Sequence, residues 1–162
     1  MKNAILAAML AGGASFALAG CGETAEAPAA VEESSDLIEG IEVSDARLLL
    51  PPVTGNPAAI YLKIANNGDQ NIAFRSAEVE IAGRAEIHDS MEMDGTMVMG
   101  QAPPVMIETG GEATFEPGGL HVMVFDLAED FGVGDTTKVT LIAAGNRRHT
   151  FEVTAMAAGD DR

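Results

Sequence analysis

The chain has 162 residues, a single cysteine and a formal net charge of −16, and this length allows one folded domain with little room for a second. Such an acidic surface repels nucleic acid and anionic lipid headgroups, so we expect neither as a partner. Because Cys21 is the only cysteine, the sequence excludes an intrachain disulfide, a CxxC redox pair and a cysteine-based zinc site.

Residues 1–20 are expected to be a lipoprotein signal peptide. Lys2 precedes an apolar run over residues 4–10 and a stretch of small residues, which is the order of charge, apolar core and small-residue end in secretory signals. Residues 18–21, Leu-Ala-Gly-Cys, resemble the lipobox of bacterial lipoproteins. Cleavage before Cys21 would let it carry acyl chains that anchor the protein to a lipid bilayer. An ordinary signal peptide would instead leave an unpaired thiol outside the cytoplasm.

The mature chain is expected to have three parts. Residues 21–36 are acidic, rich in Ala, Pro and Ser, and without apolar periodicity, which predicts a disordered tether. Residues 37–156 form the folded domain, and residues 157–162 form a flexible tail. Removal of residues 1–20 leaves eight basic and 25 acidic side chains, a formal charge of −17.

The domain alternates short β-like runs with Gly, Pro, Asn and Asp. The predicted strands are residues 41–50, 58–65, 71–79, 84–88, 96–99, 105–107, 113–115, 120–126, 137–143 and 148–154. Strands of this length and spacing are typical of an all-β sandwich or barrel. Outside the signal peptide, no long stretch has the 3.6-residue period of a helix.

Methionines are abundant and unevenly placed, with five of the nine inside residues 91–106. A methionine fills a core more often than it binds a metal, and we expect that of Met106. Met91, Met93 and Met97 are left open as loop residues, core fillers or auxiliary ligands. His149, which follows two arginines, is expected at the surface.

The run over residues 120–126 places His121 beside Met123. Because strand side chains alternate between faces, these two should share one face while Val122 and Val124 face the core. An imidazole and a thioether on one face could bind one ion. His88 and Met99 end two other predicted strands, so three strand ends could meet at one rim. The nearby acids could offset the charge of a cation or could simply be solvated: Glu86, Asp89, Glu92 and Asp94.

The donor types limit the ion. Soft thioethers favour Cu(I), whereas calcium and magnesium need oxygen ligands. Zinc is possible through the two histidines, but methionine is a poor zinc ligand and no cysteine or further clustered histidine completes a tetrahedron. A blue-copper electron-transfer site needs a cysteine thiolate, which a lipidated Cys21 would not supply.

The spacing His-x10-Met-x21-His-x-Met is met by His88, Met99, His121 and Met123. It resembles the signature of the periplasmic copper chaperone family PCu(A)C. Residues 59–69, 85–88 and 116–123 also resemble that family, and the likeness covers residues 41–153. It implies a cupredoxin-like Greek-key β-sandwich that binds one Cu(I) per chain through these two histidines and two methionines.

The resemblance also implies a function. Members of the family carry copper to the binuclear copper centre of cytochrome c oxidase, directly or through a thiol-containing metallochaperone. We therefore expect a monomeric chaperone on the periplasmic side of a bacterial membrane. The chain lacks the Met- and His-rich C-terminal tail of some members, so a second, Cu(II) site is not expected.

Two other functions stay open. Copper sequestration would need the same ligands as delivery, and a metal-free interaction module would explain the fold and the anchor but not the spacing. We expect no enzyme, because the sequence has no Ser-His-Asp order, Gly-rich phosphate loop or prominent carboxylate pair.

Overall fold

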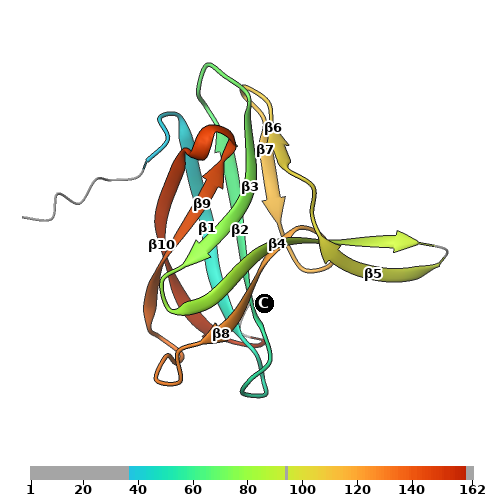
Figure 1. Ribbon diagram of the computed structural model, residues 1–162, viewed down its shortest axis with the longest axis vertical. Coiled ribbons are helices and arrows are strands. Elements are labelled where there is room, and N and C mark those ends of the chain that lie inside the picture. Colours follow the sequence, from blue (N-terminus) through green and yellow to red (C-terminus); the bar gives the residue numbers. More distant parts are fainter. Residues whose placement is uncertain (1–36, 94, 160–162) are drawn as a thin grey trace, which may run out of the picture. The chain divides into compact units, whose positions relative to one another are not determined.

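The computed structural model describes residues 37–93 and 95–159, except for the side chains of Glu92, Met93 and Met97 (Figure 1). These residues belong to one compact unit, Ser34–Arg162. The predicted signal peptide, Cys21, the tether and the last three residues lie outside the described residues.

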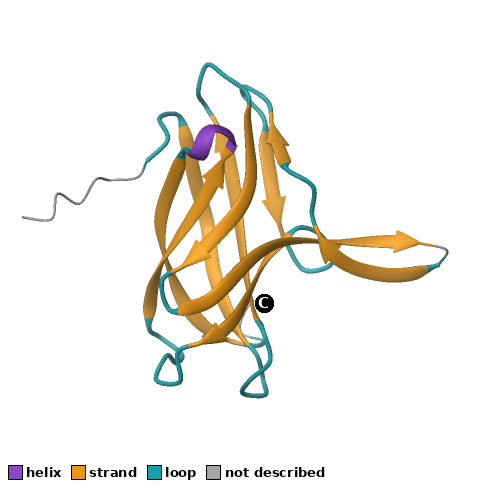
Figure 2. Cartoon of the chain, in the orientation of Figure 1, coloured by secondary structure: helices purple, strands orange, loops and turns teal. Residues whose placement is uncertain are grey.

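The described chain is almost entirely strand (Figure 2). The strands are β1 (Ile41–Leu50), β2 (Ala58–Asn66), β3 (Ile72–Val79), β4 (Ala82–Met93), β5 (Thr96–Gln101), β6 (Val105–Ile107), β7 (Glu112–Phe115), β8 (His121–Leu127), β9 (Thr136–Ala143) and β10 (Arg148–Ala157). One 3₁₀ turn, η1 (Ala144–Asn146), joins the last two. In the described residues no helix is long and apolar enough to cross a membrane.

The strands form one sheet in the order β5-β4-β8-β2-β1-β10-β9-β3-β6, and β7 pairs with the second half of β2. The first and last strands pair in parallel, and the other described pairs are antiparallel. The sheet curves so that apolar side chains of β2 and β8 share one core with those of β3 and β9.

Strict alternation of apolar residues builds this core. In β2, Ile60, Leu62 and Ile64 are buried while the residues between them are not. Each such aliphatic side chain stabilises the fold by about 1.5–3 kcal/mol when fully buried. The predicted inward direction of Val122 and Val124 on β8 is confirmed, since neither is exposed.

The largest departure from the predicted strands is in β4, which was expected to end at residue 88 and continues to Met93. Its pairing with β8 runs as far as His88, and its pairing with β5 begins there. The remainder of β4 and β5 therefore extend from the sheet as a hairpin, residues 89–101, which we call the arm (Figure 1).

Two burial predictions are wrong. Met106 was expected in the core but is 63% exposed, because Val105 and Ile107 on either side of it in β6 face inward. His149 was expected at the surface but is only 5% exposed. Its Nδ1 accepts a hydrogen bond from the backbone N–H of Ile38 at 3.1 Å. The surface prediction rested on the two arginines before His149, and they give no indication of a partner so distant in sequence.

Candidate metal centre

Two cross-strand pairs form the centre of the candidate site. On β4 and β8, His88 lies directly opposite His121, and Glu86 lies directly opposite Met123. The two imidazole rings have centroids 6.0 Å apart. Since residues two apart on a strand share a face, both histidines and Met123 lie on the same face of the sheet.

Met99 joins this face from the arm. It lies opposite Ser90 in the β4–β5 pairing, where His88 lies opposite Gln101. Met99 is therefore the diagonal neighbour of His88 on the same face, a position within reach of a long side chain. Its side chain is 57% exposed.

The strand registers thus place the four predicted ligands at neighbouring positions on one face, but not as three converging strand ends. His88 lies within β4 and Met99 within β5, and only His121 begins its strand. The ligands are neighbours across three adjoining strands, so the ladder registers set their relative positions.

An aromatic ring lies near each of the two histidines. The ring centroid of His121 is 6.4 Å from that of Tyr61 on β2, and the ring centroid of His88 is 6.3 Å from that of Phe125 on β8. His121 is 4% exposed and the side chain of His88 is 14% exposed. The imidazoles are therefore largely shielded from water, whereas Met99 is not.

Among the described residues, each histidine engages one ring nitrogen in a hydrogen bond. Nδ1 of His121 donates to the carbonyl oxygen of Gly119 at 2.9 Å, which leaves Nε2 as the lone-pair donor. Nε2 of His88 donates to Oε2 of Glu86 at 2.8 Å. Nδ1 of His88 is buried and has no hydrogen-bond partner among the described residues. An orphaned buried nitrogen of this kind suits a metal ligand.

Glu86 is held in turn by Arg84, whose Nη1 donates to Oε1 of Glu86 at 2.5 Å. Hydrogen bonds from His88 and then from Arg84 lower the pKa of Glu86 below its ordinary value. The guanidinium of Arg84 lies over the ring of Phe125, 3.9 Å from its centroid. A carboxylate therefore stands beside the histidine pair at neutral pH.

Sequence reasoning gave these supporting groups no specific role. Glu86 could have been found by alternation, because it precedes His88 by two residues on a strand. The carbonyl of Gly119 carries no sequence signal. Met91 lies on the face of β4 opposite to that of His88, because it is three residues further along the strand.

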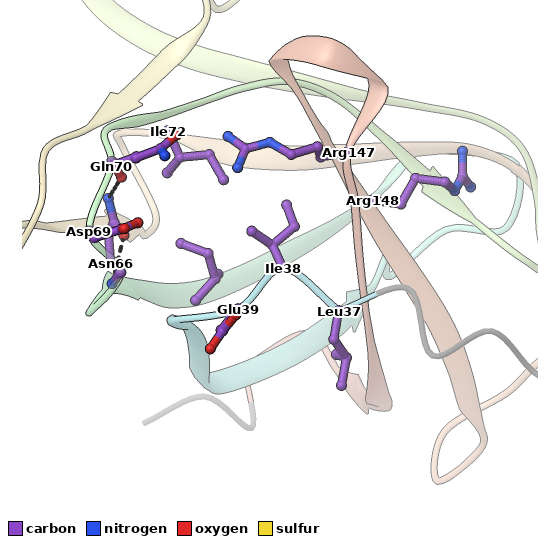
Figure 3. Close-up of a pocket in the computed structure, with 11 residues that line it drawn as sticks. Leu37, Ile38, Glu39, Asn66, Asp69, Gln70, Ile72, Arg147 and Arg148 are labelled. Carbon is purple, nitrogen blue, oxygen red and sulfur yellow. Dashed lines mark hydrogen bonds between the residues drawn. The ribbon is translucent and has the colours of Figure 1, made fainter.

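Other described regions differ from this centre. No group of three His, Cys, Asp or Glu side chains in the described residues is arranged to hold a metal ion. A pocket of about 470 Å³ has Ile38, Asn66 and Arg147 among its lining residues (Figure 3). Its lining contains none of the four predicted ligands.

Solved structures with the same fold include two PCuAC domains and the protein DR1885. The copper-bound PCuAC domain of PmoF2 is 17% identical, with 74% of this chain and 95% of that chain covered and a TM-score of 0.59. The apo PCuAC domain of PmoF1 is 24% identical, with 74% and 96% covered and a TM-score of 0.60. Cu(I)-bound DR1885 from Deinococcus radiodurans is 25% identical, with 83% and 90% covered and a TM-score of 0.60.

The fold and its neighbours define an all-β, cupredoxin-like domain of the PCuAC type, as the resemblance implied. The chain belongs to the LpqE-like family, whose sequence model matches residues 41–155 and whose name refers to a lipoprotein. No curated protein matches the sequence.

Proposed function

We propose that the chain binds one Cu(I) ion through Nδ1 of His88, Nε2 of His121 and the sulfur atoms of Met99 and Met123. The observation that carries this proposal is the cross-strand histidine pair, in which each ring keeps one nitrogen without a hydrogen-bond partner among the described residues. Two soft thioethers on the same face select Cu(I) over harder ions. The copper-bound state of two proteins with this fold supports the same ion.

We further propose that the protein carries copper rather than acting as an enzyme. Three ligands are at least half-buried, but Met99 is 57% exposed on β5, which is an edge strand of the sheet. An acceptor can therefore replace the exposed thioether first and take the ion by stepwise ligand exchange. The proposed acceptor is the binuclear copper centre of cytochrome c oxidase or a thiol-containing metallochaperone, as the resemblance to PCu(A)C implies.

The proposed location is the periplasmic side of a bacterial membrane, with a lipid on Cys21. The lipobox-like residues 18–21 support it, as does membership of a family named for a lipoprotein. The domain then works as a monomer on its tether.

Copper titration tests the binding proposal. Residues 37–162 are titrated with Cu(I) under a reductant and a competing chelator, and we expect uptake of one equivalent. Met99→Ala with His121→Ala should remove two of the four donors and abolish tight binding. Met106→Ala, which alters an exposed methionine on β6, is the matched control and should bind normally. Equal affinity in the double variant and the wild type would contradict this site.

A deletion strain separates delivery from sequestration. Delivery predicts low cytochrome c oxidase activity that added copper restores. Normal oxidase activity together with raised copper sensitivity would instead establish sequestration by the same ligands.

A further inference from the structure

We propose that Glu86 is the positioning residue for His88, and that it fixes the imidazole in the tautomer that presents Nδ1 to copper. This role rests on the proposed Cu(I) site. Glu86 is not itself one of the four ligands, since its carboxylate oxygens are engaged by His88 and Arg84.

Alternation on β4 places the three groups in a row. Arg84, Glu86 and His88 occupy every second position of the strand and so share one face. One carboxylate oxygen, Oε1, accepts from Arg84 at 2.5 Å, and the other, Oε2, accepts from His88 at 2.8 Å. The carboxylate is thus held from both sides, and its second oxygen points to Nε2 of the imidazole.

Arg84 is itself restrained. Its guanidinium lies 3.9 Å from the ring centroid of Phe125, and the centroid of that same ring is 6.3 Å from that of His88. Arg84, Glu86 and His88 therefore border one aromatic ring. This packing limits the positions that the carboxylate can adopt, so the hydrogen bond to His88 costs little additional ordering.

The consequence for copper follows from the imidazole itself. A neutral imidazole carries one N–H, so donation from Nε2 to Glu86 leaves the lone pair on Nδ1. A carboxylate that accepts from the distal nitrogen also raises the basicity of the coordinating one. His121 has a neutral carbonyl, that of Gly119, in the equivalent role. The two histidines are therefore supported unequally, and His88 is the more electron-rich donor.

Glu86 also contributes charge. Four neutral donors would leave Cu(I) with its full positive charge, and the carboxylate beside His88 would attract it, although the ion pair with Arg84 compensates part of the carboxylate charge. The protein thereby retains a monovalent cation without placing an oxygen in its coordination shell.

Two variants of the full chain test this role against a matched control. In Glu86→Ala, Cu(I) affinity should fall about 10- to 100-fold, the usual cost of losing such a partner. Glu86→Gln keeps an acceptor oxygen for Nε2–H but no charge, so its affinity should lie between those of the Ala variant and the wild type. Asp89→Ala removes a carboxylate from the opposite face of β4 and should bind like the wild type.

The tautomer is read independently by two-bond ¹H–¹⁵N NMR of the imidazole rings in the metal-free chain. The wild type and Glu86→Gln should hold His88 with its proton on Nε2, and Glu86→Ala should give a mixture of tautomers. A proton on Nδ1 in the wild type, or unchanged affinity in Glu86→Ala, would overturn the role of Glu86. Failure of the wild-type chain to bind Cu(I) would instead overturn the proposed function itself.

Discussion

His149 joins the beginning of the domain to its last strand. Its Nδ1 accepts the backbone N–H of Ile38 at 3.1 Å, so the ring must be unprotonated at that nitrogen. Burial lowers its pKa below the ordinary value of 6.5, because a charged imidazole loses hydration there.

Stability should therefore fall as the pH drops. The folded state holds fewer protons on His149 than the unfolded state, so stability is complete above about pH 6.5 and is lost as the pH falls toward the lowered pKa. Urea unfolding at pH 7.5 and 5.5 measures this. The pKa values of Glu86 and Asp45 are lowered from 4.5 and 3.8. These two carboxylates therefore contribute little to the change in stability between pH 7.5 and pH 5.5. His149→Gln should reduce the pH dependence, and an unchanged slope would contradict this assignment.

Asn66 provides a second test at the scale of one side chain. It is 1% exposed, and its Nδ2 donates to the carbonyl of Gln70 at 2.9 Å (Figure 3). Its Nδ2 also donates to the carbonyl of Ile107 at 3.1 Å, and its Oδ1 accepts from the N–H of Gly68 at 3.1 Å. Asn66→Ala leaves these groups without partners.

We expect Asn66→Ala to lower the free energy of unfolding by about 2–3 kcal/mol, since each unsatisfied buried group costs about 1–3 kcal/mol. Asn67→Ala is the control, because its side chain is exposed and makes one long contact, 3.4 Å to Glu42. That variant should stay within about 0.5 kcal/mol of the wild type. Denaturant unfolding of both compares them, and equal losses would show that the buried hydrogen bonds are not the cause.

At the scale of elements, alternation and turn residues were enough to predict most strands and the shared face of His121 and Met123. The same alternation, applied to the buried neighbours of Met106, would also have placed that side chain outward. The extension of β4 was missed because residues 89–93 pair with β5 alone in the described chain. Neither face of the arm has to be apolar, so the sequence there lacks the alternation that would have indicated a strand.

The arm gives an element-scale prediction about the methionines. Met91 and Val98 lie opposite each other and are 48% and 42% exposed, on the face of the arm away from Met99. Met91→Ala should leave Cu(I) affinity unchanged, whereas Met99→Ala should weaken it by removing one soft donor. Chelator competition measures both variants. A comparable loss in Met91→Ala would assign it the auxiliary role that the sequence left open.

At the scale of the whole molecule, the sequence contains the spacing that resembles PCu(A)C, but it does not specify the contacts that orient the four predicted ligands. The carboxylate on His88 and the carbonyl on His121 depend on side-chain and backbone geometry that spacing does not specify. The proposed membrane attachment, by contrast, rests on the lipobox-like residues and on the family name, since Cys21 lies outside the described residues.

Attachment can be tested by Cys21→Ser in cells. Without the thiol no lipid can be added, so the protein should move from the membrane fraction to the soluble periplasmic fraction. Cu(I) affinity should not change, because Cys21 is not among the proposed ligands. Fractionation with immunoblotting measures the distribution, and a variant that stays in the membrane fraction would contradict a lipid anchor.

The register of β2 has a consequence for where copper is presented. Ile41, where β1 begins, lies opposite Asn66, while Met123 lies opposite Ala59, seven residues away along the strand, or about 23 Å. Anchoring through the N-terminal side would therefore keep the metal centre toward the free end of the domain. Sixteen residues from Cys21 to residue 36 span at most about 55 Å. With the proposed anchor, such a short connection would raise the effective concentration of the protein for acceptors embedded in the same membrane, and it would exclude acceptors beyond that radius.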